Sequence, residues 1–251
     1  MKSPQNPLVT VYITNHNYGK YISKAIMSVL KQSMNSFELI IIDDGSKDNS
    51  KKIIDKFKKN KKVISVFQKN KGLTVSNNLA LRLAKGKYIM RLDADDWLDR
   101  NALQIMSNYL EKNNNIGLVF PDYFEVDEKG DIINLVRRHD FKKVKLLDKP
   151  AHGACTMIRK ECLNKIGGYN ERFDRQDGFY LWVKFIQRYG VMNINLPLFF
   201  YRQHNQSLTK NEEKIIKTRA DIIKMDNFKK NSQKKALAIL AVRGYEINPN
   251  N

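Results

Sequence analysis

Two acidic segments each follow a short apolar run, where a buried strand would end. Asp43-Asp44-Gly45-Ser46 follows the run 39–42, and Asp93-Ala94-Asp95-Asp96 follows the run 88–92. In wound α/β sheets, ligands bind in the crevice at the carboxyl ends of the strands. We therefore expect a ligand-binding or catalytic site at both segments.

The second segment holds three carboxylates within four positions, including the Asp-x-Asp pattern of Asp93 and Asp95. Like charges this close repel one another, and a hard divalent cation with oxygen ligands relieves the repulsion. We favour a metal site over a solvated turn in which Asp96 or Asp99 caps the next helix. If the strand conformation continues, Asp93 and Asp95 share one side, so one can face a ribose or phosphate while the other binds the ion.

The first segment has two interpretations. Gly45 permits a tight turn, and a carboxylate at this point stands where the base and ribose of a nucleotide are usually read. Alternatively, Asp44 and Ser46 start or cap the following helix. These residues alone leave both interpretations open.

Two further polar residues are candidates only in combination with the acidic segments. Asp177 stands just ahead of a helix predicted over about 178–189, and His204 ends the sequence Tyr201-Arg202-Gln203-His204. Taken singly, Asp177 is explained by N-capping and His204 by an ordinary surface histidine.

The elements that must position these residues alternate through the first half of the chain. Short β-branched or aromatic runs predict buried strands, and apolar residues at helical spacing predict the helices between them. This rhythm implies an α/β fold with a mostly parallel, right-handed wound sheet covered by helices on both faces. We expect strands at 8–13, 39–42, 63–67, 88–92 and 118–120, and apolar helix faces within 18–30, at 53, 54 and 57, at 75, 79 and 83, and at 103, 106 and 110.

The second half of the chain mixes strands and helices without the regular alternation of the first half. A hairpin is expected from 123–126 and 132–136, a helix over 160–166 that ends at Gly167-Gly168, and a late strand over 192–200 interrupted by Pro197. We assign residues 1–209 to one domain and residues 210–251 to a Lys-rich helical extension.

Composition excludes several classes of protein. With 251 residues and 42% hydrophobic content, the chain can bury a sizeable core and is not of the disordered type. It contains no apolar stretch of roughly 18 residues and no apolar leader at its start, so we expect a cytoplasmic protein. Cys155 and Cys162 lack the spacing of a zinc site and are expected to be reduced packing residues.

The net charge of +19 favours an anionic partner, but 33 of the 45 basic residues are Lys. Proteins that bind nucleic-acid phosphates and bases use more Arg, because its planar guanidinium group can form two parallel hydrogen bonds. As explanations of this positive charge, we rank a solvated Lys-rich face first, peripheral contact with an anionic membrane second and binding to nucleic acid third.

Taken together, these segments and several others along the chain resemble the conserved segments of the family 2 glycosyltransferases of GT-A fold. The resemblance spans about residues 8–207 with every segment in family order. It is carried by Val9 to Asn17, Ser28 to Ser33, Glu38 to Asp48, Asn70-Lys71-Gly72, Ala84 to Ile89, Asp93 to Asp96, Gly167 to Glu171, Asp177 and Tyr201 to Ser207.

The resemblance implies an inverting, metal-dependent transfer from a nucleotide-sugar, with a UDP-sugar the expected donor. A glycan or a lipid-linked saccharide of cell-surface polysaccharide synthesis is the implied acceptor, and Mg²⁺ or Mn²⁺ is the implied ion. Asn17 and Asn77 stand where the family pattern differs, Asn77 at a common Arg position, and both are expected near the donor. By the same matching, Asp44 or Asp43 reads the base, Asp93 lies near the ribose, Asp95 binds the metal, Asp177 is the general base and His204 adds a metal ligand or touches the diphosphate.

Two alternatives remain. A sugar nucleotidyltransferase would need a Gly-rich, basic phosphate loop after the first strand, and Thr14 to Tyr18 offers none. A basic module binding nucleic acid or an anionic membrane would use the Lys-rich segment between Lys47 and Lys71, and its affinity would fall steeply with salt.

Overall fold

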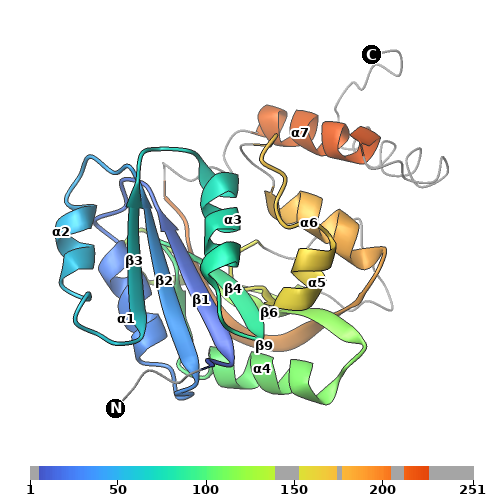
Figure 1. The fold of residues 1–251 in the computed structure, drawn as a ribbon, viewed down its shortest axis with the longest axis horizontal. Coiled ribbons are helices and arrows are strands. Elements are labelled where there is room, and N and C mark those ends of the chain that lie inside the picture. The colour runs from blue at the N-terminus through green and yellow to red at the C-terminus, as the bar shows by residue number, and fades with distance from the viewer. Residues whose placement is uncertain (1–5, 139–152, 174–176, 205–211, 226–251) are drawn as a thin grey trace.

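The computed structural model describes residues 6–138, 153–173, 177–204 and 212–225. Its strands are β1 (Val9–Asn15), β2 (Phe37–Asp44), β3 (Val63–Gln68), β4 (Tyr88–Asp93), β5 (Trp97–Leu98), β6 (Ile116–Val126), β7 (Ile132–Val136), β8 (Met157–Arg159) and β9 (Gly190–Arg202). Its helices are α1 (Ile22–Leu30), α2 (Ser50–Asp55), α3 (Leu73–Leu83), α4 (Ala102–Lys112), α5 (Lys160–Lys165), α6 (Asp177–Ile186) and α7 (Glu212–Met225). Within these residues, one sheet runs in the order β3-β2-β1-β4-β8-β6-β9-β5, and β7 pairs with β6 (Figure 1).

The first half of the sheet is parallel, as the alternating pattern predicts. β1 lies between β2 and β4 and pairs with both in parallel, while β3 extends the sheet beyond β2. The register sets Asn15 beside Asp43 and Thr14 beside Asp93. The carboxyl ends of these three strands therefore meet at one edge of the sheet, where both acidic segments emerge.

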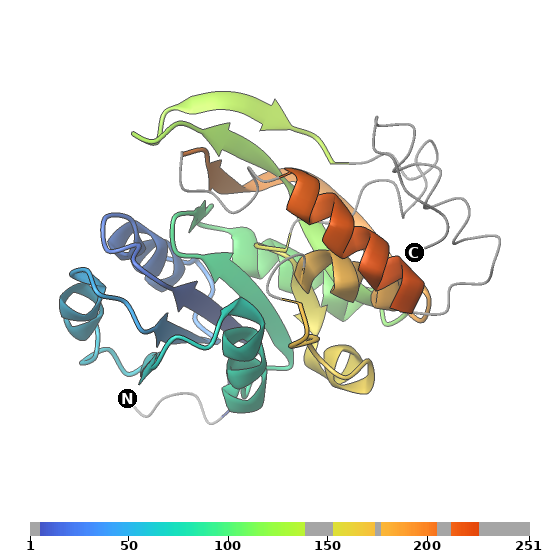
Figure 2. The same ribbon diagram turned by 90° about the horizontal axis from the view of Figure 1, so that it is seen from above.

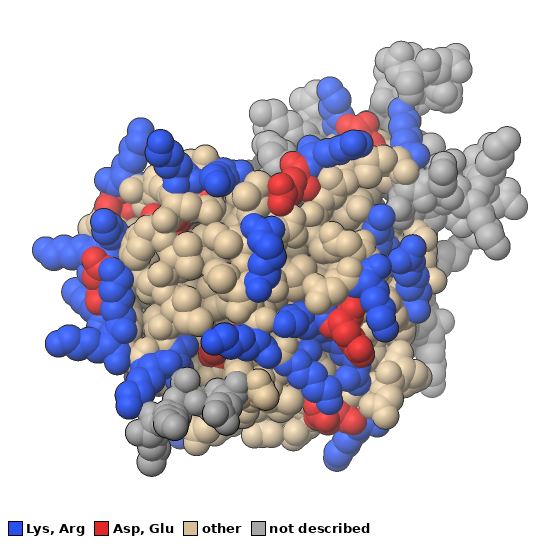
Figure 3. Space-filling view, in the orientation of Figure 1, with Lys and Arg blue, Asp and Glu red and all other residues tan. Residues whose placement is uncertain are grey.

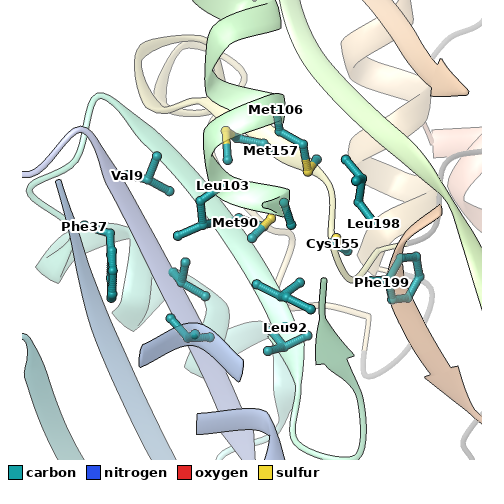
Figure 4. Close-up of a cluster of buried hydrophobic side chains, with 14 of the residues drawn as sticks. Val9, Phe37, Met90, Leu92, Leu103, Met106, Cys155, Met157, Leu198 and Phe199 are labelled. Carbon is teal, nitrogen blue, oxygen red and sulfur yellow. The ribbon is translucent and has the colours of Figure 1, made fainter. Parts of the chain in front are cut away.

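Helices cover both faces of the sheet, which confirms the three-layer architecture. The larger apolar cluster lies between the sheet and α1, α2 and α4, and the second lies under α3, α5 and α6. Figure 4 shows part of the larger cluster, in which Phe37, Met90, Leu103 and Phe199 come from different elements. Cys155 and Cys162 are buried, unpaired packing residues, as expected.

The second half of the sheet is mixed. β6 runs parallel to β9, whereas β5, β7 and β8 pair with their neighbours in antiparallel fashion. The expected hairpin is formed by β6 and β7, which lie at one edge of the molecule in Figure 2. The β6–β9 register shifts near Pro121 and Pro197, because proline cannot donate a ladder hydrogen bond.

The predicted apolar face of α3 is confirmed only in part. Leu79 packs against the second apolar cluster, but Leu83 is exposed. The buried positions of this helix are Thr74, Ser76, Asn77 and Ala80. A helix this polar on its buried side is positioned by hydrogen bonds as well as by apolar packing, and Asn77 supplies one of them at the candidate site below.

α7 packs on the domain. Ile222 is fully buried against Phe179, Tyr180 and Val183 of α6, and the two helices lie side by side in Figure 1. The described part of the Lys-rich extension is therefore a helix packed on α6, while residues 226–251 lie outside the described part. The division at residue 209 stays a prediction. Among the described residues, no helix combines the length and the apolar character needed to cross a membrane.

Lys and Arg side chains are spread over the surface, with a group over α2 at the left edge of Figure 3. Lys51 and Lys52 of α2, with Lys56 and Lys59 after it, are exposed, while Ile54 on the inner side of the helix is buried. This segment therefore combines an apolar inner face with solvated lysines.

Candidate active site

Asp44 ends β2 and organises the loop that leads into α3. Its Oδ1 accepts hydrogen bonds from Gln68 Nε2 (2.7 Å) and the Lys71 backbone N–H (2.9 Å), and its Oδ2 accepts one from the Gly72 N–H (2.8 Å). Three donors fix the orientation of this buried carboxylate and hold the 70–72 loop beside it. Asp44 therefore lies at the sheet edge with its orientation set.

Asp43 is held on the other side of the same turn. It accepts hydrogen bonds from Asn15 Nδ2 (2.8 Å) and the Ser46 N–H (3.0 Å), and Gly45 has the positive φ of +77° expected for this turn. The capping interpretation is wrong, because α2 begins only at Ser50 and the Ser50 N–H is bound by Asp48 (2.9 Å).

Asn17 lies beside this turn in a left-handed conformation, with φ of +62°. Its N–H donates to Ser46 Oγ (2.8 Å), and its Oδ1 accepts from the Lys47 N–H (2.7 Å). The side chain is exposed. Asn17, Asp43 and Asp44 are thus brought together at the ends of β1 and β2, on the predicted donor side.

The Asp-x-Asp segment departs from the geometry expected of it. β4 ends at Asp93, and the Asp96 N–H bonds back to the Asp93 carbonyl (3.2 Å), so the chain turns instead of continuing as a strand. Asp93 forms an ion pair with Arg91, 2.9 Å from Oδ1 to Nε, whereas Asp95 has a different partner. The two carboxylates therefore face different groups.

Asp95 is paired with His204, whose Nε2 lies 2.8 Å from Asp95 Oδ2. The imidazole stacks on Tyr21 at 5.5 Å between ring centroids and meets Tyr18 edge-on at 5.7 Å. Burial and the nearby charge of Asp93 raise the pKa of Asp95, although the contact with His204 opposes the rise. The predicted pair of metal ligands is thus assembled, in a position where added positive charge would be stabilising.

Asp96 is buried and does not cap a helix. It accepts the Arg202 N–H (2.9 Å), while the Arg202 side chain donates from Nε to the Asp95 carbonyl (2.9 Å). Desolvation, followed by repulsion from Asp95 and Asp93, raises the pKa of Asp96 well above its usual range. Arg202 also donates to the carbonyls of Asp127 and Glu128 in the β6–β7 turn.

Asp177 is the first residue of α6, and its carboxylate points at the sheet. Arg91 Nη1 donates to Asp177 Oδ2, and Asn77 Nδ2 donates to the same oxygen at 2.9 Å. Burial alone would lower the pKa of Arg91, but Asp177 and Asp93 outweigh it and raise that pKa well above its usual range. The observed partners of Asp177 are therefore side chains of β4 and α3.

The residues present suit a divalent cation that is held partly by the protein and partly by the substrate. Among the described residues, no three His, Cys, Asp or Glu side chains are arranged to hold one ion. Mg²⁺ is typically bound by one or two carboxylates together with substrate phosphates, without an all-protein cage. Asp95 with His204 offers such an incomplete set of ligands.

Sequence reasoning missed Arg91 and Arg202. Arg91 lies within an apolar strand run, and the available signal was its spacing of two from Asp93, which places both on one face of β4. Arg202 lies in a segment that was singled out, but its contacts depend on how β9, β5 and the β6–β7 turn meet.

Comparison with known proteins gives the family. The sequence model of glycosyl transferase family 2 matches residues 10–167, more than half of the chain. The chain belongs to this family. Acidic residues at the ends of β2 and β4 fall inside the matched segment, whereas Asp177 and His204 lie beyond it.

One relative is the Escherichia coli protein WfgD, a UDP-Glc:alpha-D-GlcNAc-diphosphoundecaprenol beta-1,3-glucosyltransferase. It is 27% identical over 218 residues, which cover 86% of this chain and 85% of WfgD. Some curated relatives are much longer: the match covers 34% of the chondroitin synthase of Escherichia coli and 19% of that of Pasteurella multocida, at 27% and 28% identity.

Solved structures agree on the fold. Staphylococcus aureus TarS (residues 1–349) in complex with UDP-GlcNAc superposes with a TM-score of 0.73 at 16% identity, covering 97% of this chain and 74% of that one. The mannosyltransferase PcManGT of Pyrobaculum calidifontis, in complex with GDP-Man and Mn²⁺, gives 0.65 at 18% identity over 97% and 66%. The chain has the GT-A fold that the sequence predicts.

Proposed function

We propose that this family 2 glycosyltransferase moves a sugar from a UDP-sugar to a glycan or a lipid-linked saccharide, with inversion at the anomeric carbon. The observation that carries the proposal is that one guanidinium, that of Arg91, contacts both Asp93 and Asp177. The predicted ribose-side carboxylate and the predicted base therefore share one partner and lie close together. A direct displacement requires the base to be held close to the bound donor.

Inversion needs one in-line displacement, in which a carboxylate takes the proton of the acceptor hydroxyl as the new bond forms. Asp177 is the candidate for this base. Asp44, Asp43 and Asn17 lie at the ends of β1 and β2, where they would contact the base and ribose of the donor.

The site suits a divalent cation, and we propose Asp95 and His204 as the side chains that hold Mg²⁺ or Mn²⁺. Such an ion supplies Lewis-acid stabilisation of the negative charge on the departing diphosphate. Burial and, after it, the charge of Asp93 raise the pKa of Asp95, and a bound cation would offset the second of these effects. PcManGT binds Mn²⁺ with GDP-Man, which supports the same arrangement in this fold.

A lipid-linked acceptor is supported by the diphosphoundecaprenol substrate in the name of WfgD. Such an acceptor would place the enzyme at the inner face of the membrane, and the exposed lysines around α2 would favour contact with anionic headgroups. Nucleic acid is the weaker candidate for the partner that this positive charge binds.

The test is a thermal-shift panel of UDP, GDP and their sugars with and without Mn²⁺, followed by transfer assays with the sugars that bind. A ligand at about 100 times its dissociation constant stabilises the folded state by roughly 2.7 kcal/mol. UDP with Mn²⁺ should give the largest shift, and a released UDP with a β-linked product from an α-linked donor would establish inversion. Stabilisation by no nucleotide, with salt-sensitive binding to nucleic acid instead, would favour the binding-module alternative.

A further inference from the structure

The hydrogen bonds of Asp177 are unequally divided between its two carboxylate oxygens. Both contacts described in the structure go to Oδ2, one from Arg91 Nη1 and one from Asn77 Nδ2. The side chains of Arg91 and Asp177 are 8% and 7% exposed, and Asn77 is fully buried. Two donors on one oxygen of a buried carboxylate fix both the position and the rotation of the group.

The three residues come from three separate elements. Arg91 belongs to β4, Asn77 to the polar buried side of α3, and Asp177 to the first turn of α6. Asn77 Oδ1 is buried and has no hydrogen-bond partner among the described residues, so this amide is held with its nitrogen toward Asp177 while its oxygen lacks a described donor. A group held in this way in a fully buried position is a candidate for a functional role.

Arg91 also connects this carboxylate to the donor side. Its Nε lies 2.9 Å from Asp93 Oδ1, and its Nη2 donates to Asp93 Oδ2 at 3.4 Å. The planar guanidinium can contact two carboxylates at once in a fixed relative geometry, which the single ammonium of a lysine cannot. Motion of Asp177 relative to Asp93 is therefore restricted by one rigid group.

We infer that Arg91 and Asn77 are positioning residues for the base, anchoring Asp177 Oδ2 so that Oδ1 is the oxygen that takes the acceptor proton. This rests on the proposed function. In the step, the acceptor O–H bond breaks and its proton goes to Oδ1, the acceptor oxygen bonds to the anomeric carbon, and the bond from that carbon to the diphosphate breaks with its electron pair leaving on the diphosphate. Asn77 then serves the base rather than the donor, unlike the role expected from its place in the sequence.

Asn77→Leu is the sharpest test, because it keeps the size of the side chain and removes the donor to Asp177. Misplacing a reacting group by about 1 Å can cost 10²-fold in rate, so we expect kcat per folded enzyme to fall by about 10- to 100-fold. The dissociation constant of UDP with Mn²⁺, measured by calorimetry, should stay within about twofold of wild type. A direct donor contact by Asn77 predicts the reverse, with weaker UDP binding.

Arg91→Lys is the second variant, and Arg159→Lys is its matched control. Arg159 is also a buried arginine, but it donates to the carbonyls of Ile116, Leu110 and Asn113. Arg91→Lys should lower kcat and weaken UDP binding together, because it loosens both Asp177 and Asp93. Arg159→Lys should lower the melting temperature without changing kcat per folded enzyme.

The outcomes separate the two proposals. If Asp177→Asn loses transfer while Asn77→Leu and Arg91→Lys keep wild-type kcat per folded enzyme, the positioning inference is overturned and the base assignment stands. If Asp177→Asn transfers at the wild-type rate, the base assignment and the positioning inference both fail while sugar transfer itself stands. If the wild type transfers no sugar, the proposed function fails and the inference fails with it. A kcat loss in Asn77→Leu with unchanged UDP binding supports both.

Discussion

His204 Nε2 lies 2.8 Å from Asp95 Oδ2, although the two residues are 109 positions apart. The contact depends on the antiparallel pairing of β5 with β9, which sets Trp97 beside Phe200. Asp95 stands just before β5 and His204 just after β9, so this short pairing brings them together. The two-residue strand β5 therefore has a large effect on the site.

Asp95→Ala should abolish the metal-dependent part of UDP binding and leave the protein folded. The lost contact with His204 is worth about 1 kcal/mol, and relief of the repulsion from Asp93 offsets part of it. Calorimetry of UDP with Mn²⁺ and with EDTA measures the effect. Asp55→Ala, on the exposed side of α2, is the control and should bind as wild type. Unchanged Mn²⁺-dependent binding in Asp95→Ala would remove Asp95 from the site.

Arg202→Met should destabilise the protein by about 1–3 kcal/mol, because it removes the hydrogen bonds that a buried guanidinium donates to the part-buried carbonyls of Asp95 and the β6–β7 turn. Urea denaturation measures the change, with an unchanged m-value indicating that only stability has altered. Lys20→Met is the control. Its ion pair with Glu128 is exposed to solvent, so its loss should leave the urea midpoint nearly unchanged. Equal losses in the two variants would contradict a structural role for Arg202.

Asp48→Asn tests a carboxylate that links the start of α1 to α2 by accepting the N–H groups of Gly19 (2.8 Å) and Ser50 (2.9 Å). Burial alone would raise the pKa of Asp48, but hydrogen bonds from Ser50 and Gly19 outweigh it and lower that pKa. The carboxylate therefore stabilises the fold fully above the unfolded pKa, and this stabilisation is lost as the pH falls through the lower folded pKa.

At pH 7 this substitution should cost no more than about 1 kcal/mol, since solvent screens so exposed a group. Urea midpoints of wild type and Asp48→Asn should converge as the pH is lowered below 3.8, the ordinary value for Asp. A difference that stays constant down to low pH would show that ionisation of Asp48 is irrelevant.

The parallel half of the fold could be predicted because its strands are continuous apolar runs and its acidic segments begin where those runs end. α3 was partly misjudged, because its apolar residues at 75, 79 and 83 suggest a buried face, whereas Asn77 and Ser76 occupy the interior. Spacing identifies amphipathic helices, but it gives no signal for a helix that buries polar groups against a distant partner.

The residues of the site could be identified singly, but not their pairing. Asp93 and Asp95 looked alike in sequence, and the turn after β4 gives Asp93 to Arg91 and Asp95 to His204. Asp177 was expected to have a competing role as an N-cap, and only the packing of α6 on the sheet shows which side chains it contacts. Such pairings depend on tertiary contacts, which a single sequence does not encode locally.

The last prediction concerns Asp177→Asn, on which the proposed enzymatic role depends most. Asn keeps the size of the side chain but cannot take the acceptor proton, so turnover should fall by roughly 10² to 10⁴, the usual contribution of a general base. UDP binding with Mn²⁺ should barely change, because Arg91 keeps its ion pair with the donor-side carboxylate Asp93 when Asp177 is replaced by Asn. Loss of the charge facing Arg91 will also lower stability, so transfer is measured per folded enzyme, below the melting temperature of the variant. A purely structural role predicts that activity follows the folded fraction alone. Near wild-type transfer by the folded variant would move the search for the base to other carboxylates close in the sequence, Asp174 first.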